Sequence, residues 1–176
     1  MCVTFLFLLL QPSVKAAENL ISFLKIESIK GDSNQKGHSG EIEALGFATG
    51  VDLPSPAPGG GTEAKPEFFE VIVTKNIDKA SPLLFISCAT GKLLPNATLT
   101  MARVTPTSSV DFFKIILTNV VISRVETKGL SGTKGALSEE VALRFTKVQW
   151  SITTFNAEGK PTIITRGYDL ANGKVF

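Results

Sequence analysis

The sequence predicts a mainly β protein, a β-barrel of about seven strands with one short flanking α-helix. Two features of composition and pattern favour this class. Val, Ile, Thr and Phe are frequent, and long runs with apolar residues at helical spacing are missing. The chain also has 176 residues, of which 43% are apolar, so one ordinary domain can form a core without disulfide bonds.

Segments of alternating apolar and polar residues, separated by turn residues, are the predicted strands. In the segment 139–156 the apolar residues change phase, which predicts a bulge near Thr146 and Lys147. A similar change in 110–127 predicts a bend near Asn119, and such bends let long strands turn the corners of a small barrel. The predicted strands cover residues 20–29, 40–51, 67–76, 97–104, 110–127, 139–156 and 161–170.

One segment has the signals of a helix. Ser81 is suited to cap it, Pro82 fits the first helical position, and Gly91 suits its end. Apolar residues lie almost all round this helix. A helix of this kind is covered on more than one side, either by its own barrel alone or by that barrel and a neighbouring subunit.

Residues 1–16 have the pattern of a secretory signal peptide, although no Lys or Arg precedes the apolar run 3–10. Val14 and Ala16 are small residues at the positions that a signal peptidase recognises, and the apolar run is too short to span a bilayer. The mature protein would be a single domain, residues 17–176, in a secreted or periplasmic location. If instead the start codon has been placed too early, the protein would be cytoplasmic before export.

The segment 53–66 is rich in Pro and Gly and has almost no apolar side chains, which predicts an extended loop within the same domain. Its glycine run, 59–61, is not followed by the Lys-Ser or Lys-Thr pair of a phosphate-binding loop. The 18 Lys and Arg residues nearly balance the 16 Asp and Glu residues, so the charge gives no reason to expect a nucleic-acid partner.

The sequence predicts no catalytic, metal or cofactor site, and therefore no enzyme. His38 is the sole histidine and lies in a polar turn, where we expect it to bond to nearby backbone or water. Cys88 lies in the apolar helix, where a thiol is normally a small core residue. Glu139 and Glu140 are adjacent on a predicted strand and should point to opposite faces, so they cannot converge on one substrate. A hydrolase that uses His38 is a distant alternative, to be discarded if replacing His38 changes no turnover.

Several short sequence blocks occur along residues 20–170. No single block identifies a family, but the order in which the blocks follow one another is specific. They include Asn119-Val120, Glu139-Glu140-Val141 and Trp150, and together they resemble the Hcp family, the tube subunits of bacterial type VI secretion. The blocks are residues 23–26, 29–33 with His38, 41–45, 50–51, 78–82, 91–92, 117–123, 139–150 and 167–172.

The resemblance implies a ring-forming structural subunit whose hexameric rings stack into a hollow tube driven by a sheath. Its partners would be further copies of itself and possibly sheath, spike and effector proteins, without stable membrane insertion. In that family the loop after the second strand reaches towards the next ring. Here that loop contains the residues Leu53, Gly59, Gly60, Gly61 and Pro66.

Alternation on the second strand predicts which residues face the tube interior. Leu45 and Phe47 share one face, and Ala44, Gly46 and Ala48 share the other. We expect the large residues to enter the core and the small ones to line the lumen, while close packing of the small face against another strand is an equal alternative.

A removable export signal is out of place in a tube subunit, because those subunits leave the cytoplasm through their own machine. The chain could therefore be an exported relative that kept the ring and lost the sheath. A second alternative is a stand-alone secreted or periplasmic β-barrel binding module, which would stay monomeric and have a pocket.

Overall fold

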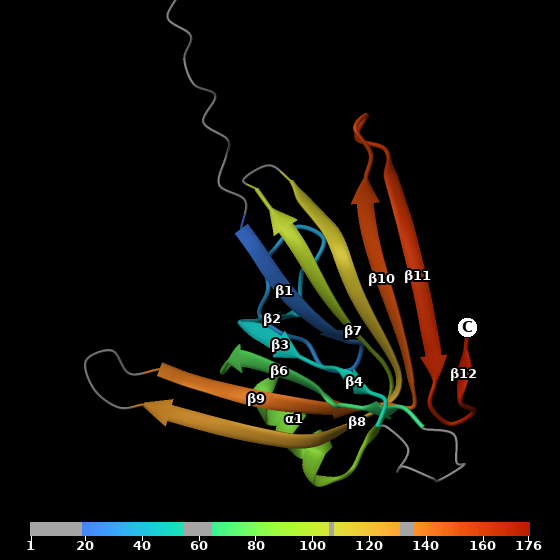
Figure 1. Ribbon diagram of the computed structural model, residues 1–176. Coiled ribbons are helices and arrows are strands. Elements are labelled where there is room, and N and C mark those ends of the chain that lie inside the picture. Colours follow the sequence, from blue (N-terminus) through green and yellow to red (C-terminus); the bar gives the residue numbers. More distant parts are fainter. Residues whose placement is uncertain (1–18, 55–64, 106–107, 131–135) are drawn as a thin grey trace, which may run out of the picture.

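The computed structural model describes residues 19–54, 65–105, 108–130 and 136–176, and these form a mainly β fold with one short helix (Figure 1). The predicted fold class is confirmed. The strands are β1 (Asn19–Ile26), β2 (Ile42–Ala44), β3 (Gly46–Ala48), β4 (Val51–Asp52), β5 (Glu67–Phe68), β6 (Val71–Asn76), β7 (Leu93–Val104), β8 (Ser109–Leu130), β9 (Ala136–Arg144), β10 (Lys147–Phe155), β11 (Pro161–Asp169) and β12 (Lys174–Val175), and the helix is α1 (Ser81–Ala89).

Most strands belong to one antiparallel sheet, in the order β12-β11-β10-β8-β7-β1-β2. The long strand β8 is its centre: the first half pairs with β7 and β10, and the second half pairs with β9. β9 also pairs with β6, and β6 with β3. In Figure 1, β8 turns from the upper group of strands into the lower one, so a single strand joins both parts of the curved sheet.

The sheet curves round its core but does not close into a regular barrel. β2 pairs with β1 and β3 pairs with β6, and a bend at Leu45 separates these two short strands. At the other side β10, β11 and β12 extend beyond the curved part (Figure 1). The open sheet leaves strand edges and part of its concave face without cover from the described residues.

Several predicted strands are divided in the structure, so the strands are more numerous than the alternation of apolar residues predicted, whereas β7 and β8 are longer than predicted. The segment 40–51 divides at Leu45 and again after Ala48, and 67–76 divides after Phe68. The Phe69 N–H donates to the carbonyl oxygen of Gly50, 2.9 Å away, in the register of the β4–β5 pairs, whereas β3 and β6 pair in a register shifted by one residue. β12 was not predicted, since two residues carry no periodic signal.

Both predicted irregularities of the long strands are present, and they lie together. Asn119 in β8 has a φ of 52°, in the left-handed region that Asn tolerates better than most residues. Phe145 and Thr146 interrupt the segment predicted as one strand, between β9 and β10. The Asn119 Nδ2 donates to Thr146 Oγ1 at 3.1 Å, so one hydrogen bond links the two corners.

α1 begins and ends where predicted, but its cap differs. Ala80 is the N-cap residue and makes no side-chain cap hydrogen bond, while Pro82 stands in the first turn. The Ser81 hydroxyl is used elsewhere, in a buried polar network described below. The helix ends at Ala89, and Gly91 takes a positive φ of 61° just beyond it.

The core lies between the curved sheet and α1. Its buried side chains come from β1, β2, β6, β7, β8, β9 and β10 and from Leu84 of the helix, and full burial of a Leu or Ile side chain contributes roughly 1.5–3 kcal/mol. A smaller cluster, formed by Phe23, Ala102 and Val104, lies on the opposite face of β1 and β7. The largest fully buried aliphatic residues are Leu24, Ile26, Ile42, Leu84, Leu94, Leu99, Ile115, Leu117, Ile122 and Leu143.

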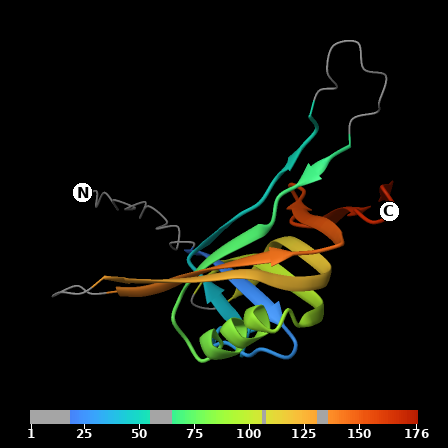
Figure 2. The same ribbon diagram turned by 90° about the horizontal axis from the view of Figure 1, so that it is seen from below.

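β4 and β5 form a separate two-stranded ribbon, in which Val51 pairs with Phe68 and Asp52 with Glu67. Figure 2 shows this ribbon projecting away from the body of the protein, on the side opposite α1. The ribbon carries the two ends of the predicted loop 53–66, of which residues 55–64 lie outside the described residues, with Gly59, Gly60 and Gly61 among them. The predicted signal peptide, residues 1–16, also lies outside them.

Candidate assembly surfaces

The concave face of the sheet carries a row of aromatic side chains at the edge of the core. Phe47 and Phe113 stack with ring centroids 6.2 Å apart, and Trp150 meets Phe113 edge-on at 5.2 Å. Phe47 and Phe113 pack against the core cluster, whereas Trp150 is 45% exposed. The row therefore marks where the core ends and an uncovered apolar surface begins.

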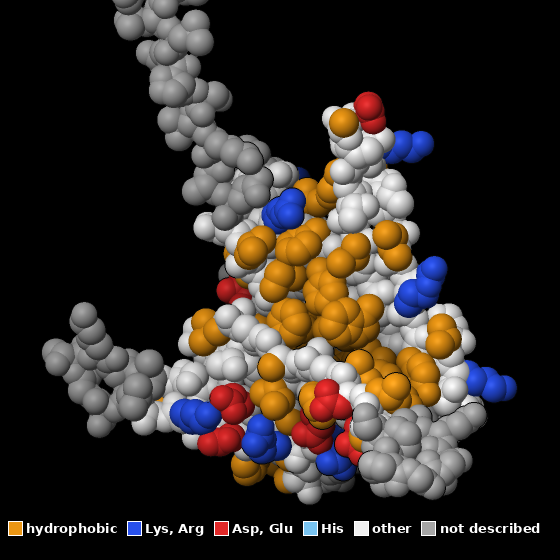
Figure 3. Space-filling model, in the orientation of Figure 1, with side chains coloured by type: hydrophobic (Ala, Val, Ile, Leu, Met, Phe, Trp, Pro, Cys, Tyr) orange, Lys and Arg blue, Asp and Glu red, His pale blue; other side chains and the backbone are white. Residues whose placement is uncertain are grey.

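Beyond this row the β10–β11 hairpin carries large apolar side chains on both of its faces. Ile152 and Ile164 are cross-strand partners, so they share one face, and Ile163 lies on the other. All three are between 44% and 67% exposed. Figure 3 shows hydrophobic side chains gathered across the middle of this side of the protein. Exposed apolar patches of this kind mark sites of contact with other proteins.

A groove of about 430 Å³ lies where the ribbon meets the last strands. Its walls are largely apolar and come from β4, β5, β10, β11 and β12. The single charged residue in the lining, Arg166, donates from Nη1 to the carbonyl oxygen of Thr165 at 2.7 Å. The lining residues are Val51, Phe68, Val148, Trp150, Arg166, Gly167, Tyr168 and Val175.

The predicted ring-stacking loop, 53–66, has one exposed end and one half-buried end. Leu53 is 67% exposed, whereas Pro66 is half-buried. Phe68 at the base of the ribbon packs on Tyr168 with ring centroids 5.0 Å apart. The base of the ribbon is thus attached to β11, and Leu53 extends into solvent.

The small residues predicted to share one face do not all do so. Phe47 packs against the core as predicted, but Leu45 is 63% exposed, so its predicted core position is wrong. The bend at Leu45 interrupts the alternation, and as a result Ala44 also packs against the core. Gly46 and Ala48 face outward: Ala48 is exposed, and a Cβ built on Gly46 would meet nothing within 4 Å.

The outward face around Gly46 continues as a wall of paired charges. Gly46 pairs with Thr74 and Thr74 with Glu140, so all three share this face. Glu140 accepts from Lys128 Nζ at 2.8 Å. This hydrogen bond raises the pKa of Lys128 and lowers that of Glu140, so both stay charged and largely neutralise each other. Acidic and basic side chains appear together in the lower part of Figure 3.

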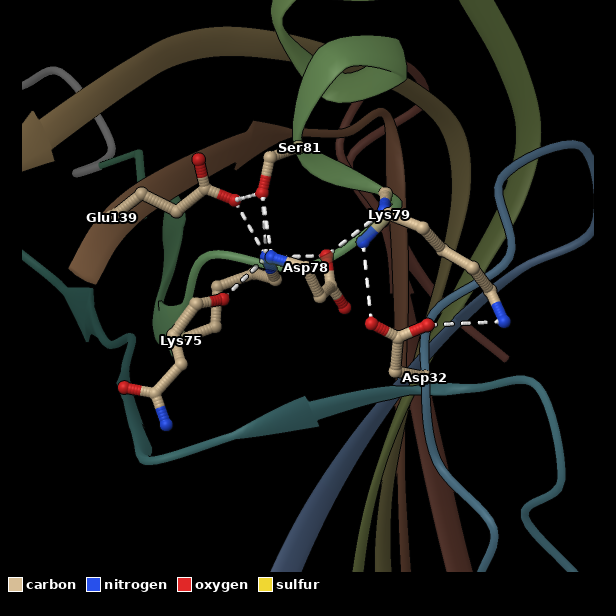
Figure 4. A network of polar contacts seen from close by, with 8 residues as sticks. Asp32, Lys75, Asp78, Lys79, Ser81 and Glu139 are labelled. Atoms are coloured by element: carbon tan, nitrogen blue, oxygen red, sulfur yellow. Dashed lines mark hydrogen bonds and ion pairs between the residues drawn. The ribbon is translucent and has the colours of Figure 1, made fainter. Parts of the chain in front are cut away.

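A buried polar network fixes the start of α1 against β6 and β9 (Figure 4). Lys75 is fully buried, and its Nζ donates to Glu139 Oε1 at 2.6 Å and to Asp78 Oδ1 at 2.8 Å. The Ser81 hydroxyl donates to the same Glu139 oxygen at 2.7 Å. Two carboxylates therefore compensate one buried ammonium, which such a group requires in an apolar core.

Glu139 and Glu140 point to opposite faces, as predicted: Glu139 is buried with Lys75, and Glu140 faces outward with Lys128. Cys88 is a half-buried free thiol in α1 that packs against the core.

His38 was predicted to bond to backbone or water, and this is wrong. It is 5% exposed, and its ring stacks on Phe23 with centroids 4.0 Å apart. Its Nδ1 lies 2.8 Å from Glu41 Oε2, and its Nε2 lies 2.9 Å from Asp111 Oδ1. Burial acts to raise the pKa of Asp111, but Lys114 and His38 outweigh it and the pKa is lowered. His38 thus joins the turn before β2 to β8, a structural role.

Within the described ranges, no helix is long and apolar enough to cross a membrane, and no three His, Cys, Asp or Glu side chains are grouped to hold a metal ion. The chemistry of the described surfaces is that of contact: an open sheet, an apolar face, a groove and a projecting ribbon. These define a class of protein, a mainly β subunit that associates with other chains.

The comparisons with known proteins identify the family. Residues 23–152 match the family described as type VI secretion system effector, Hcp. The chain is 35% identical to protein hcp1 of Pseudomonas aeruginosa over 139 residues, which is 78% of this chain and 85% of that protein.

Solved structures agree. The crystal structure of Hcp1 from Salmonella typhimurium is 30% identical, with a TM-score of 0.75, and the match covers 89% of this chain and 99% of that one. A type VI secretion system effector from Yersinia pestis is 27% identical, with a TM-score of 0.66 and coverage of 84% and 98%. The chain belongs to the Hcp family of type VI secretion, as the order of its sequence blocks predicted.

Proposed function

We propose that this chain is a structural tube and carrier subunit of a type VI secretion system, and that six copies close into a ring whose stacking makes a hollow tube. Membership of the Hcp family supports the proposal. The observation that carries it in this chain is the uncovered apolar surface of a well-packed protomer, since Trp150, Ile152 and Ile164 are each 44% to 52% exposed beside a closed core. The role is mechanical, without catalysis.

The proposed channel wall is the outward face that includes Gly46 and Ala48. Both are small and face away from the core, and the ion pair of Glu140 and Lys128 on the same face is neutralised. A wall with short side chains at Gly46 and Ala48 and with its longer charged side chains paired suits passage of varied cargo. Ala44 was predicted to line the lumen, but it packs against the core and would border the channel only at its margin.

The ribbon and the segment 53–66 form the proposed contact between stacked rings. The ribbon projects from the body, and Leu53 at its end is exposed. Within the proposal, the loop with Gly59, Gly60, Gly61 and Pro66 reaches the next ring. Residues 17–176 would be one domain, and residues 1–16 a cleaved signal in an exported form of the protein.

A second candidate function is a stand-alone secreted binding module. The groove of about 430 Å³ favours it, because a pocket of this size with an apolar lining suits a small ligand. Such a module would remain monomeric.

Replacing residues 55–64 by a short Gly-Ser linker tests the tube proposal. We expect rings of unchanged mass that no longer stack, seen as single rings in negative-stain images. Stacks that form as well as those of the unmodified chain would contradict the role of the loop, and a chain that is monomeric before and after the change would favour the binding module.

A further inference from the structure

α1 is an exposed helix without a single charged side chain. Its sequence, Ser81 to Ala89, contains no acidic or basic residue. Its buried face consists of Ser81, Leu84 and Ser87, and the other side is open. A helix on the surface of a soluble protomer normally has a charged outer face, and one that is apolar all round is buried in the functional state.

Three large side chains, Leu83, Phe85 and Ile86, are spread over the open side of this helix, and this apolar side is called the ridge. They are 49%, 59% and 57% exposed. The ridge has a defined position, because the network of Lys75, Glu139 and Ser81 holds the start of the helix against the sheet. A rigid apolar ridge loses little conformational entropy on binding, which favours its use as an anchor in an interface.

The same protomer carries a receptor of matching character, the groove between the ribbon and the last strands. Its volume of about 430 Å³ can hold large side chains, and Val51, Trp150 and Val175 in its walls are 53%, 45% and 70% exposed. Its one charged lining residue, Arg166, already donates to backbone. Arg166 is exposed, so its guanidinium can stay in solvent at the edge of the groove while an apolar ridge enters.

Ridge and groove lie on different sides of the protomer. In Figure 2, α1 lies on one side of the body, and the ribbon that walls the groove leaves from the other. A protomer cannot therefore fill its own groove. A contact between two copies leaves one free ridge and one free groove, so the same contact can repeat from copy to copy, as self-assembly of one chain requires.

We infer that the α1 ridge of one copy docks into the groove of the next copy, with Phe85 and Ile86 facing the wall formed by Trp150 and Val175. The inference rests on the proposed tube function and specifies one of its contacts. The occupant of the groove is a second copy of this chain rather than a small ligand, and the partner of α1 is the same chain rather than a different protein.

The first test is Phe85→Asp in the full chain, with Leu137→Asp as the matched control. Phe85 and Leu137 are 59% and 58% exposed, so both substitutions add a charge at an equally open apolar position. The expected result is an increase of roughly tenfold or more in the protein concentration at half assembly for Phe85→Asp alone, measured by light scattering. Circular dichroism and the melting temperature confirm that both variants fold.

The second test is a disulfide between copies. Ile86→Cys with Val175→Cys, in a chain with Cys2 and Cys88 replaced by Ser, should give a ladder of linked oligomers on mild oxidation, because the two positions meet only across the contact. Ile86→Cys with Leu137→Cys serves as the control pair and should give none.

Normal assembly of Phe85→Asp together with no ladder would overturn the inference and leave the tube function intact. A Phe85→Asp variant that assembles normally but no longer binds another protein would overturn it too, by assigning α1 to a different partner. An unmodified chain that stays monomeric at every concentration would remove the proposed function as well as the contact.

Discussion

At the scale of single residues, Lys75 is a charged side chain in the core that requires a charged partner. It is fully buried, and Glu139, which is 1% exposed, accepts from it at 2.6 Å. The energy of such a pair is asymmetric: formation of the pair contributes little net stability, whereas loss of one partner leaves a charge in a medium that cannot solvate it. The main effect of the network of Lys75, Glu139 and Ser81 is therefore to fix the position of α1 on the sheet, and its net contribution to stability is small.

Lys75→Met alone should lower the free energy of unfolding by about 3–5 kcal/mol, because the buried carboxylate of Glu139 then loses its cationic partner. The double variant Lys75→Met, Glu139→Leu should recover part of that loss. Urea titrations at one protein concentration measure both. Lys79→Met, which breaks the exposed pair of Lys79 and Asp32, should change little and is the control. A Lys75→Met protein as stable as the unmodified one would refute a structural role for the network.

Asp169 gives a prediction for acid conditions. Hydrogen bonds from Lys147 and Asn172 lower the pKa of Asp169 from 3.8 to about 2. A carboxylate with a lowered pKa stabilises the fold above its unfolded pKa, and this contribution is lost as the pH falls through the folded value. The melting temperature should therefore drop between about pH 4 and about pH 2 partly through this group.

In Asp169→Asn the stability should be lower at neutral pH and the dependence on pH over the same interval weaker. Glu158→Gln, in the exposed turn between β10 and β11, is the control and should leave the profile unchanged. An Asp169→Asn profile parallel to that of the unmodified chain would mean that Asp169 is not stabilised by its neighbours.

At the scale of elements, the bends of the long strands decide the architecture. Asn119 holds a φ of 52° in the middle of β8, where the strand leaves β7 and β10 for β9. A non-glycine residue in this region costs roughly 1–2 kcal/mol more than Gly, and Asn somewhat less than Ala.

We expect Asn119→Ala to be about 1 kcal/mol less stable than Asn119→Gly, since both lose the hydrogen bond to Thr146 and only the backbone preference differs. The difference in the free energy of unfolding measures this. Equal stability of the two variants would show that β8 relaxes into a regular strand at this position.

The bends of the long strands could be predicted from the sequence, because the alternation of apolar residues changes phase at each bend. The irregularities near Asn119 and Thr146 were predicted in this way. The helix that begins at Ser81 was predicted from its terminal residues, Ser81, Pro82 and Gly91. The bend at Leu45 was not, because its neighbours Ala44 and Gly46 are small and leave no phase to compare. Alternation alone then placed an exposed leucine in the core.

Contacts between residues far apart in the chain also left no trace in local patterns. Ser81 was predicted as a helix cap because its position suits one, yet its hydroxyl donates to Glu139, 58 residues away. His38 looked like a turn residue, and its second carboxylate partner, Asp111, is 73 residues away. Local spacing cannot reveal such partners, since the fold brings them together.

At the scale of the whole molecule, the folded protomer exposes surfaces that suit contact with neighbouring chains. The sheet does not close, the concave face is apolar beyond Phe113, and an uncharged helix lies on the surface. In a monomer these surfaces would be liabilities for aggregation. In the proposed ring they would be interfaces, and family membership assigns the chain to type VI secretion.

Ala48→Arg tests the proposed channel. Because Ala48 is exposed and faces away from the core, the variant should fold normally and form rings of unchanged mass with a narrower central opening in averaged images. Its melting temperature should stay within a few degrees of the original. Loss of folding would show that this face is packed against another part of the protein and does not border a channel.

The most direct test of the tube subunit is the mass of the chain in solution, measured by light scattering on a size-exclusion column, with negative-stain images of the same peak. We expect a hexamer with a central hole. A clean monomer over a wide range of concentration would contradict it and would direct attention to the groove as a ligand site.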